Sequence, residues 1–71
     1  MDIGKLVMMA RQIERNLPAG DDVPYKLAAH LEAFWAPQMR QQLYRHVVAN
    51  RADFGYQLQQ ALDELHHQAK A

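Results

Sequence analysis

The amino-acid sequence predicts an all-α fold, a small compact bundle of three to four helices in a single domain over residues 1–71. Three observations support this prediction. Apolar residues recur at helical spacing along almost the whole chain. Short breaks with proline, glycine or aspartate separate these periodic segments. β-branched residues are few and do not alternate with polar ones over the length of a strand, which argues against a sheet.

The first half of the chain predicts two helices. Asp2 can cap a first helix of about residues 3–16, which a Pro-Ala-Gly break ends. Its apolar stripe, widened by Val7 and Met9, consists of Ile3, Leu6, Ala10, Ile13 and Leu17. Asp21 or Asp22 can cap a second helix with Pro24 in its first turn. We expect the buried face of this helix to contain Leu27, Ala28, Leu31, Phe34 and Trp35.

The second half predicts two more helices. Pro37 stops the second helix and suits the first turn of a third, at roughly residues 37–49. Its inner face is marked by Met39, Leu43 and Val47, with Tyr44 on the flank. Asp53 is positioned to cap a fourth helix that runs to about residue 69, although Gly55 weakens its first turn. The stripe of this helix is Phe54, Leu58, Ala61, Leu62 and Leu65.

Charge and hydropathy predict neither a nucleic-acid-binding nor a membrane protein. Eight basic residues balance eight acidic ones, so the net charge is zero and no basic excess exists for nucleic acid or an anionic membrane. The N-terminal segment has no long uncharged apolar run, which argues against a signal peptide and a membrane span. We therefore expect a cytoplasmic protein.

The residue types needed for catalysis are missing. The chain has no cysteine, serine or threonine, which excludes thiolate metal sites, disulfides and the common nucleophiles. The four histidines lack the i, i+4 spacing of a helical zinc site, and no glycine-rich phosphate loop is present. We expect no catalytic residue, no metal site and no cofactor bound by this chain.

An aromatic corner, Phe34-Trp35-Ala36-Pro37, is the first candidate for recognition. Large aromatic side chains at a proline-broken helix end fix the angle between two helices, and they are also common binding anchors. His30 lies four residues before Phe34, at the edge of the apolar stripe. Its ring either packs on that face or contacts another chain.

Arg40 is the second candidate. It falls inside the apolar sector of the third helix, in the first turn, where the helix dipole disfavours a cation. A charge in that place calls for a partner, because burying it unpaired is costly. Asp21, Asp22, Glu32 or a carboxylate on another protein can serve, and the alternative is a side chain that reaches back to water.

Met8 and Arg11 are the third candidate. With Arg15, they lie on the face of the first helix opposite its apolar stripe. Docking surfaces favour methionine and arginine, so this face is either simply exposed or part of such a surface.

Two segments resemble a known family. The segment KLVMMARQI is similar to the opening K-L-V-x-M-A-N-Q-I of the delta subunits of NAD-dependent, molybdenum-containing formate dehydrogenases. It matches at Lys5, Leu6, Val7, Met9, Ala10, Gln12 and Ile13. The segment AAHLEAFWAPQMRQQL resembles the family's central signature, H-x-x-x-F-W-x-P-x-M-R. The signature falls on His30, Phe34, Trp35, Pro37, Met39 and Arg40. Met8 departs from the family, where this position is often charged, and the last third matches only by its helical pattern.

The resemblance implies a non-catalytic accessory subunit or assembly factor of an enzyme that oxidises formate to carbon dioxide and reduces NAD. In that family the alpha subunit carries a molybdenum (or tungsten) pterin and iron–sulfur clusters, and the beta and gamma subunits carry FMN and further clusters. The delta subunit supports assembly, stability or cofactor loading. Docking on the alpha subunit, with beta and gamma as further partners, is expected to use the signature residues together with Met8 and Arg11.

Three other functions remain open from the residues alone. One is a stand-alone helical homodimer with a regulatory or scaffolding role. Another is a helix-turn-helix DNA binder that reads with residues 37–49, against which the neutral charge and the position of Tyr44 beside an apolar stripe both count. The last is a small enzyme, against which the missing nucleophiles and metal ligands count.

Overall fold

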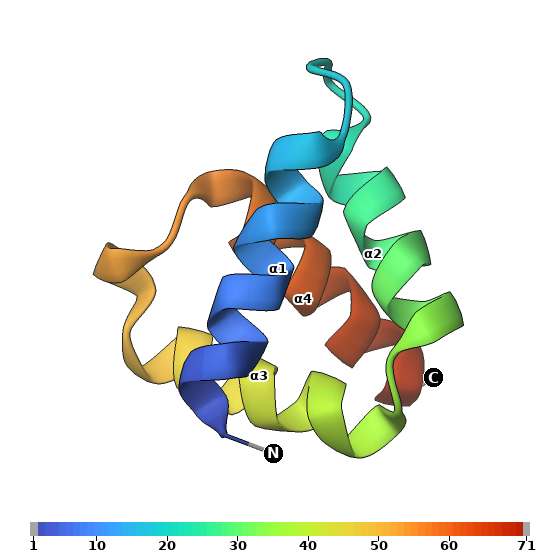
Figure 1. The fold of residues 1–71 in the computed structure, drawn as a ribbon. Helices are drawn as coiled ribbons and strands as arrows, with labels where there is room; N and C mark the ends of the chain where they lie inside the picture. Colours follow the sequence, from blue (N-terminus) through green and yellow to red (C-terminus); the bar gives the residue numbers. More distant parts are fainter. Residues whose placement is uncertain (1, 71) are drawn as a thin grey trace.

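Four α-helices form the fold in a computed structural model that describes residues 2–70, with side chains for residues 2–68 (Figure 1). The elements, in chain order, are α1 (Ile3–Asn16), α2 (Val23–Phe34), α3 (Pro37–Ala49), the short 3₁₀ helix η1 (Arg51–Asp53) and α4 (Tyr56–Lys70). No strand occurs between residues 2 and 70. The predicted all-α class is confirmed, and so are the bounds predicted for α1 and α3.

The helix starts agree with prediction in position but not in their hydrogen bonds. Asp2 and Asp22 occupy the N-cap positions of α1 and α2, yet neither side chain makes a capping hydrogen bond. The backbone carbonyl of Asp2 accepts the N–H groups of Lys5 and Leu6 instead, at 3.1 and 3.2 Å. The carboxylate of Asp22 pairs with Lys26 Nζ at 3.1 Å. The exposed carboxylate of Asp22 therefore pairs with a lysine side chain rather than with the free backbone N–H groups of α2.

The prediction that Asp53 caps the fourth helix is wrong. Asp53 belongs to η1, and α4 begins only at Tyr56. The side chain of Gln59, in the first turn of α4, donates its amide to the carbonyl oxygens of Arg51 at 3.0 Å and Phe54 at 2.8 Å. This amide thus binds one carbonyl within η1 and one just after it, and it holds the turn against the start of α4.

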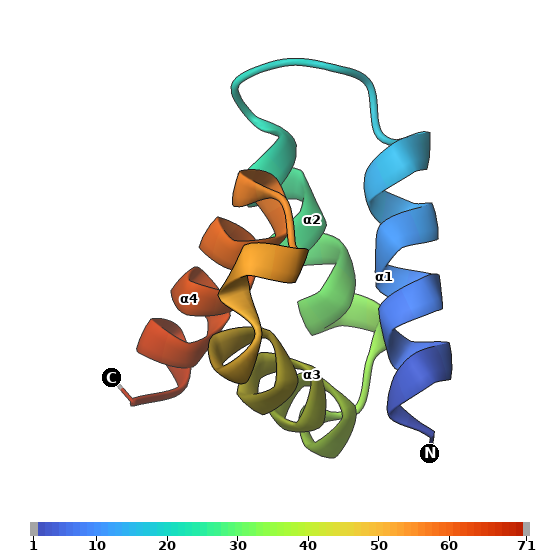
Figure 2. The ribbon, with the colours of Figure 1, turned by 90° about the vertical axis from the view of Figure 1, so that its left-hand side faces the viewer.

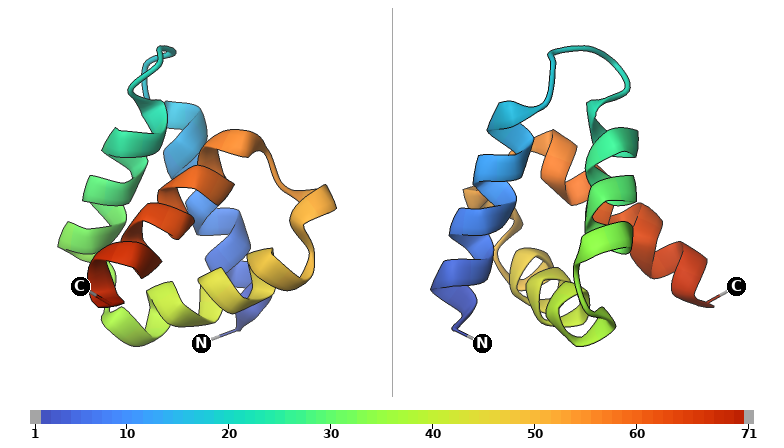
Figure 3. Two further views of the ribbon diagram at one scale, coloured as in Figure 1. Left: turned by 180° about the vertical axis from the view of Figure 1, so that it is seen from behind. Right: turned by 45° about the vertical axis from the view of Figure 1, so that its right-hand side comes forward.

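The helices cross rather than run as a parallel bundle. Packing is most extensive between α2 and α4, while α3 touches both α1 and α4. Figure 2 shows α1 and α4 on opposite sides with α3 below, and Figure 3 shows α2 beside α4 from behind. The radius of gyration is 11.0 Å, which agrees with the value of about 11 Å expected for one folded domain of this length. The arrangement is thus a single closed unit.

One continuous apolar cluster holds the helices together. It comprises Leu6, Ala10, Leu27, Ala28, Leu31, Trp35, Leu43, Val47, Phe54, Leu58, Ala61, Leu62 and Leu65. No polar or charged residue is buried among those that the structure describes. The predicted stripes therefore meet in this core, with one exception.

Phe34 is the exception, because 75% of it is exposed. It is the last residue of α2, and the next residue, Trp35, has extended backbone angles (φ −101°, ψ 141°) and is only 6% exposed. A helical wheel gives the direction of a side chain but not whether another helix covers it at that level. None of the described residues covers the last turn of α2 at Phe34, so the prediction that Phe34 is buried is wrong.

Candidate partner-binding surface

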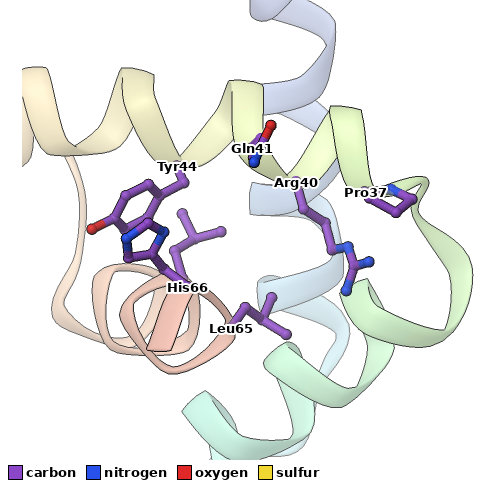
Figure 4. Close-up of a pocket in the computed structure, with 7 residues that line it drawn as sticks. Pro37, Arg40, Gln41, Tyr44, Leu65 and His66 are labelled. Carbon is purple, nitrogen blue, oxygen red and sulfur yellow. The ribbon is translucent and has the colours of Figure 1, made fainter. Parts of the chain in front are cut away.

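A small cavity opens between α3 and α4 (Figure 4). Its volume is about 110 Å³, and it is lined by Pro37, Arg40, Gln41, Tyr44, Leu62, Leu65 and His66. The rings of Tyr44 and His66 stack at 4.2 Å between centroids, with 8° between their planes. Figure 4 shows this ring pair on one side of the cavity and Arg40 with Pro37 on the other. We call this the Arg40 cavity.

Arg40 lies half-buried in the cavity, and none of the described residues supplies it with a counter-charge. Its Nε atom is closed off from water and has no hydrogen-bond partner among the same residues. Within residues 2–68 the ion pairs are Lys26 with Asp22 and Arg51 with Asp63. The internal partners considered from the sequence are therefore not used. The hydrogen bond from Lys26 also lowers the pKa of the Asp22 carboxyl, which keeps that group ionised and occupied elsewhere.

A pair of aromatic rings, the half-buried His30 and the exposed Phe34, lies at the corner that leads into α3. The ring of His30 contacts the exposed ring of Phe34 at 4.7 Å between centroids, with 41° between the ring planes, so it packs on Phe34 outside the core rather than on the buried face. Phe34 precedes Pro37, a wall of the Arg40 cavity, by three positions. Three residues of chain span at most about 11 Å. The aromatic pair and the Arg40 cavity therefore lie near each other along the chain, on either side of the α2–α3 corner.

The other predicted site residues lie elsewhere or inside. Trp35 is buried in the core, so the structure gives it a packing role. Met39 is partly buried and packs against the same cluster. Met8 on α1 is 66% exposed. Its neighbour Arg11 is engaged within the chain: Nη2 donates to the carbonyl of Asp53 at 2.8 Å.

Arg11 also lies over an aromatic ring, that of Phe54, at 5.0 Å from the centroid. The edge of His46 meets the same ring at 5.7 Å. These contacts fasten the turn that contains η1 to α1 and α3. Arg11 thus has a structural use that its position opposite the apolar stripe did not indicate.

The cavity itself was not predicted from the sequence. Gln41, Tyr44 and His66 line it, although none was a candidate from the sequence. Tyr44 and His66 are 22 positions apart and meet only because α3 packs on α4. The flank position of Tyr44 was the one available signal, and it did not identify the partner ring.

Zero net charge conceals an uneven distribution of charge among the helices. Residues 2–16 and 37–53, which contain α1, α3 and η1, carry six basic and three acidic residues. The remaining segments, 17–36 and 54–71, carry two basic and five acidic residues. One ion pair, Arg51 with Asp63 at 3.1 Å, links the two groups. The cavity wall contributed by α3 therefore belongs to the basic group of helices.

Features of metal sites and membrane spans are absent from the described part of the chain. Side chains of histidine, aspartate and glutamate nowhere gather in threes there to hold a metal ion. Within the same residues, every helix is too short or too polar to cross a bilayer.

The fold and this region define a small all-helical chain with an exposed phenylalanine at the α2–α3 corner and a cavity in which Arg40 Nε has no hydrogen-bond partner among the described residues. Comparison with protein families identifies the chain more closely. The model of the NADH-dependent formate dehydrogenase delta subunit FdsD matches residues 5–69, and the chain belongs to this family. The match confirms the resemblance of the two sequence segments and extends it over the last helix. Comparisons with curated proteins and with solved structures found no match.

Proposed function

We propose that the chain is a non-catalytic accessory subunit or assembly factor of a cytoplasmic NAD-dependent formate dehydrogenase. The observation that carries this proposal is the family match over residues 5–69. In this role the chain docks on the large alpha subunit, with the beta and gamma subunits as further contacts. Docking supports assembly, stability or loading of the molybdenum cofactor.

The residues of this chain support a role without a cofactor of its own. The complex is expected to carry a molybdenum or tungsten pterin, iron–sulfur clusters, FMN and NAD. Iron–sulfur clusters need cysteine thiolates, and the chain has no cysteine. The described residues also form no group of three metal-binding side chains. Iron–sulfur clusters and metal ions therefore do not fit these residues, and the proposal assigns all the redox groups to the other subunits.

Expression of the other subunits with and without this chain tests the proposal. We expect the complex made without the chain to contain less molybdenum per alpha subunit, or to dissociate more readily, and to oxidise formate more slowly. A tagged copy of the chain is expected to recover the alpha subunit during assembly or from the finished complex. Elemental analysis, native mass spectrometry and formate-dependent NADH formation measure these effects. Full metal content, stability and activity without the chain, with no subunit recovered by the tag, would contradict the proposal.

A further inference from the structure

The free chain keeps a buried hydrogen-bond donor without an acceptor. Arg40 Nε is shielded from water, and no acceptor lies within hydrogen-bond distance among the described residues. Folded proteins satisfy nearly all buried polar groups, because an unpaired one loses its bonds to water and gains nothing in return. An exception of this kind calls for an explanation, and a group supplied by another molecule is one.

The cavity beside Arg40 is complementary to a single anionic side chain. Its lining contains one guanidinium and no carboxylate, and two leucines and a proline form much of its wall. A cavity of about 150 Å³ in another protein admits one benzene molecule. The Arg40 cavity, at about 110 Å³, is therefore sized for one side chain and is too small for a nucleotide or a pterin.

The neighbouring surface indicates that this side chain comes from a polypeptide. Phe34 is 75% exposed and contacts His30 on one side only. Exposed aromatic groups beside an arginine are typical of the anchors in protein–protein interfaces. A free small anion in the cavity would leave Phe34 in water, whereas a polypeptide covers both features at once.

We propose that an aspartate or glutamate side chain of a partner polypeptide enters the Arg40 cavity and pairs with the guanidinium, while an apolar residue of the same partner packs on Phe34. This inference rests on the proposed function, and it names the docking surface and the chemistry of the partner. A carboxylate accepts two parallel N–H bonds from a guanidinium. Because Nε is closed off in the free chain, Arg40 turns about its last side-chain bonds when the carboxylate arrives.

Binding of variants to formate dehydrogenase purified without this chain tests the inference. In Arg40→Gln the charge is removed and an amide remains, and Arg40→Lys keeps the charge but loses the planar fork. Arg45→Gln is the matched control, because Arg45 is an exposed arginine of α3 that does not line the cavity. We expect Arg40→Gln to weaken binding at least about tenfold and Arg40→Lys by less. The control is expected to stay within about twofold, as rim charges affect mainly the association rate.

A second measurement maps the partner. A photo-crosslinking phenylalanine analogue at Phe34 is expected to capture a partner segment with aspartate or glutamate within a few residues of the crosslink. Thermal melting of each free variant, followed by circular dichroism, provides the control for folding. The inference predicts that free Arg40→Gln melts close to the wild-type temperature, because among the described residues Arg40 has no ion pair and its Nε has no acceptor to lose.

Each outcome decides between the proposals. Weakened binding of Arg40→Gln, with unchanged binding of the Arg45→Gln control and normal melting of both free variants, supports the inference. Wild-type binding by Arg40→Gln overturns the inference and leaves the accessory role intact. A marked drop in the melting temperature of free Arg40→Gln shows that Arg40 serves the fold and also overturns it. No binding by the wild-type chain overturns the inference, whereas the accessory role is refuted only if the other subunits also assemble, load metal and oxidise formate normally without the chain.

Discussion

Replacing Trp35 with alanine removes an indole ring that the core encloses almost completely, since Trp35 is 6% exposed. A side chain of this size buries about 150–250 Å², which at about 25 cal/mol per Å² corresponds to roughly 4–6 kcal/mol. The retained alanine and partial collapse of the cavity reduce the expected loss to about 3–5 kcal/mol. A 71-residue domain has a total stability of roughly 4–10 kcal/mol. Trp35→Ala is therefore expected to be largely unfolded at 37 °C.

Thermal melting followed by circular dichroism measures this effect, and the adjacent Phe34 supplies the control. At about 4–8 °C per kcal/mol, the melting temperature of Trp35→Ala is expected to fall by at least about 12 °C. Phe34→Ala removes an exposed ring and is expected to change the stability by no more than about 0.5 kcal/mol. Melting of Trp35→Ala within a few degrees of wild type, or equal losses in both variants, would refute the packing role derived for Trp35.

Three further predictions follow from the contacts and composition. Arg11→Ala loses the hydrogen bond to the Asp53 carbonyl and the cation–π contact, so urea denaturation is expected to show a loss of about 1–2 kcal/mol. Arg45→Ala, without such contacts, is expected to denature like the wild type. The hydrogen bond from Lys26 lowers the pKa of Asp22 in the folded chain. The Lys26–Asp22 interaction therefore stabilises the folded chain fully above the unfolded carboxyl pKa of about 3.9. This stabilisation is lost as the pH falls through the lower pKa that Asp22 has in the folded chain. Asp22→Asn is expected to lose this contribution at neutral pH and to unfold less steeply with acid. If the free energy of unfolding falls equally with acid in the wild type and in Asp22→Asn, this reasoning is contradicted. Because Asp22 and Lys26 are both exposed, added salt is expected to reduce the difference in stability between the two proteins. Elemental analysis of the purified chain is expected to find no stoichiometric metal, and one tightly bound transition metal per chain would overturn that expectation.

The helix bounds were predictable because local rules determine them. Proline fixes its own φ and restricts the residue before it, so Pro37 ends α2 and begins α3 whatever packs nearby. The weak start expected at Gly55 likewise agrees with the observed start of α4 at Tyr56. The apolar stripes identified nearly all core residues because a 3.6-residue period gives side-chain direction directly.

The features that escaped prediction depend on contacts between distant segments. The exposure of Phe34 depends on which helices reach the last turn of α2, and a single helix does not contain that information. The start of α4 lies beyond Asp53, and the turn before it is held by the Gln59 amide, which donates to the carbonyls of Arg51 and Phe54. The Arg40 cavity needs α3 and α4 to meet, so only the anomaly of a charge in an apolar sector was visible beforehand.

The core of this chain is built almost entirely from leucine, alanine and valine, and its described part encloses no polar side chain. Contacts of this kind have no preferred direction, so small sliding movements of the helices break no hydrogen bond within the core, and the polar contacts of Arg11 with Asp53 and of Arg51 with Asp63 lie outside it. Exchange of one core leucine for methionine is accordingly expected to cost less than about 1.5 kcal/mol. The angle between α2 and α3 is set instead at their junction, where Trp35 and Pro37 stand. A protein that binds at this junction can change the angle between α2 and α3 without breaking a polar contact in the core. We therefore expect the chain to adjust this angle to the protein that binds it.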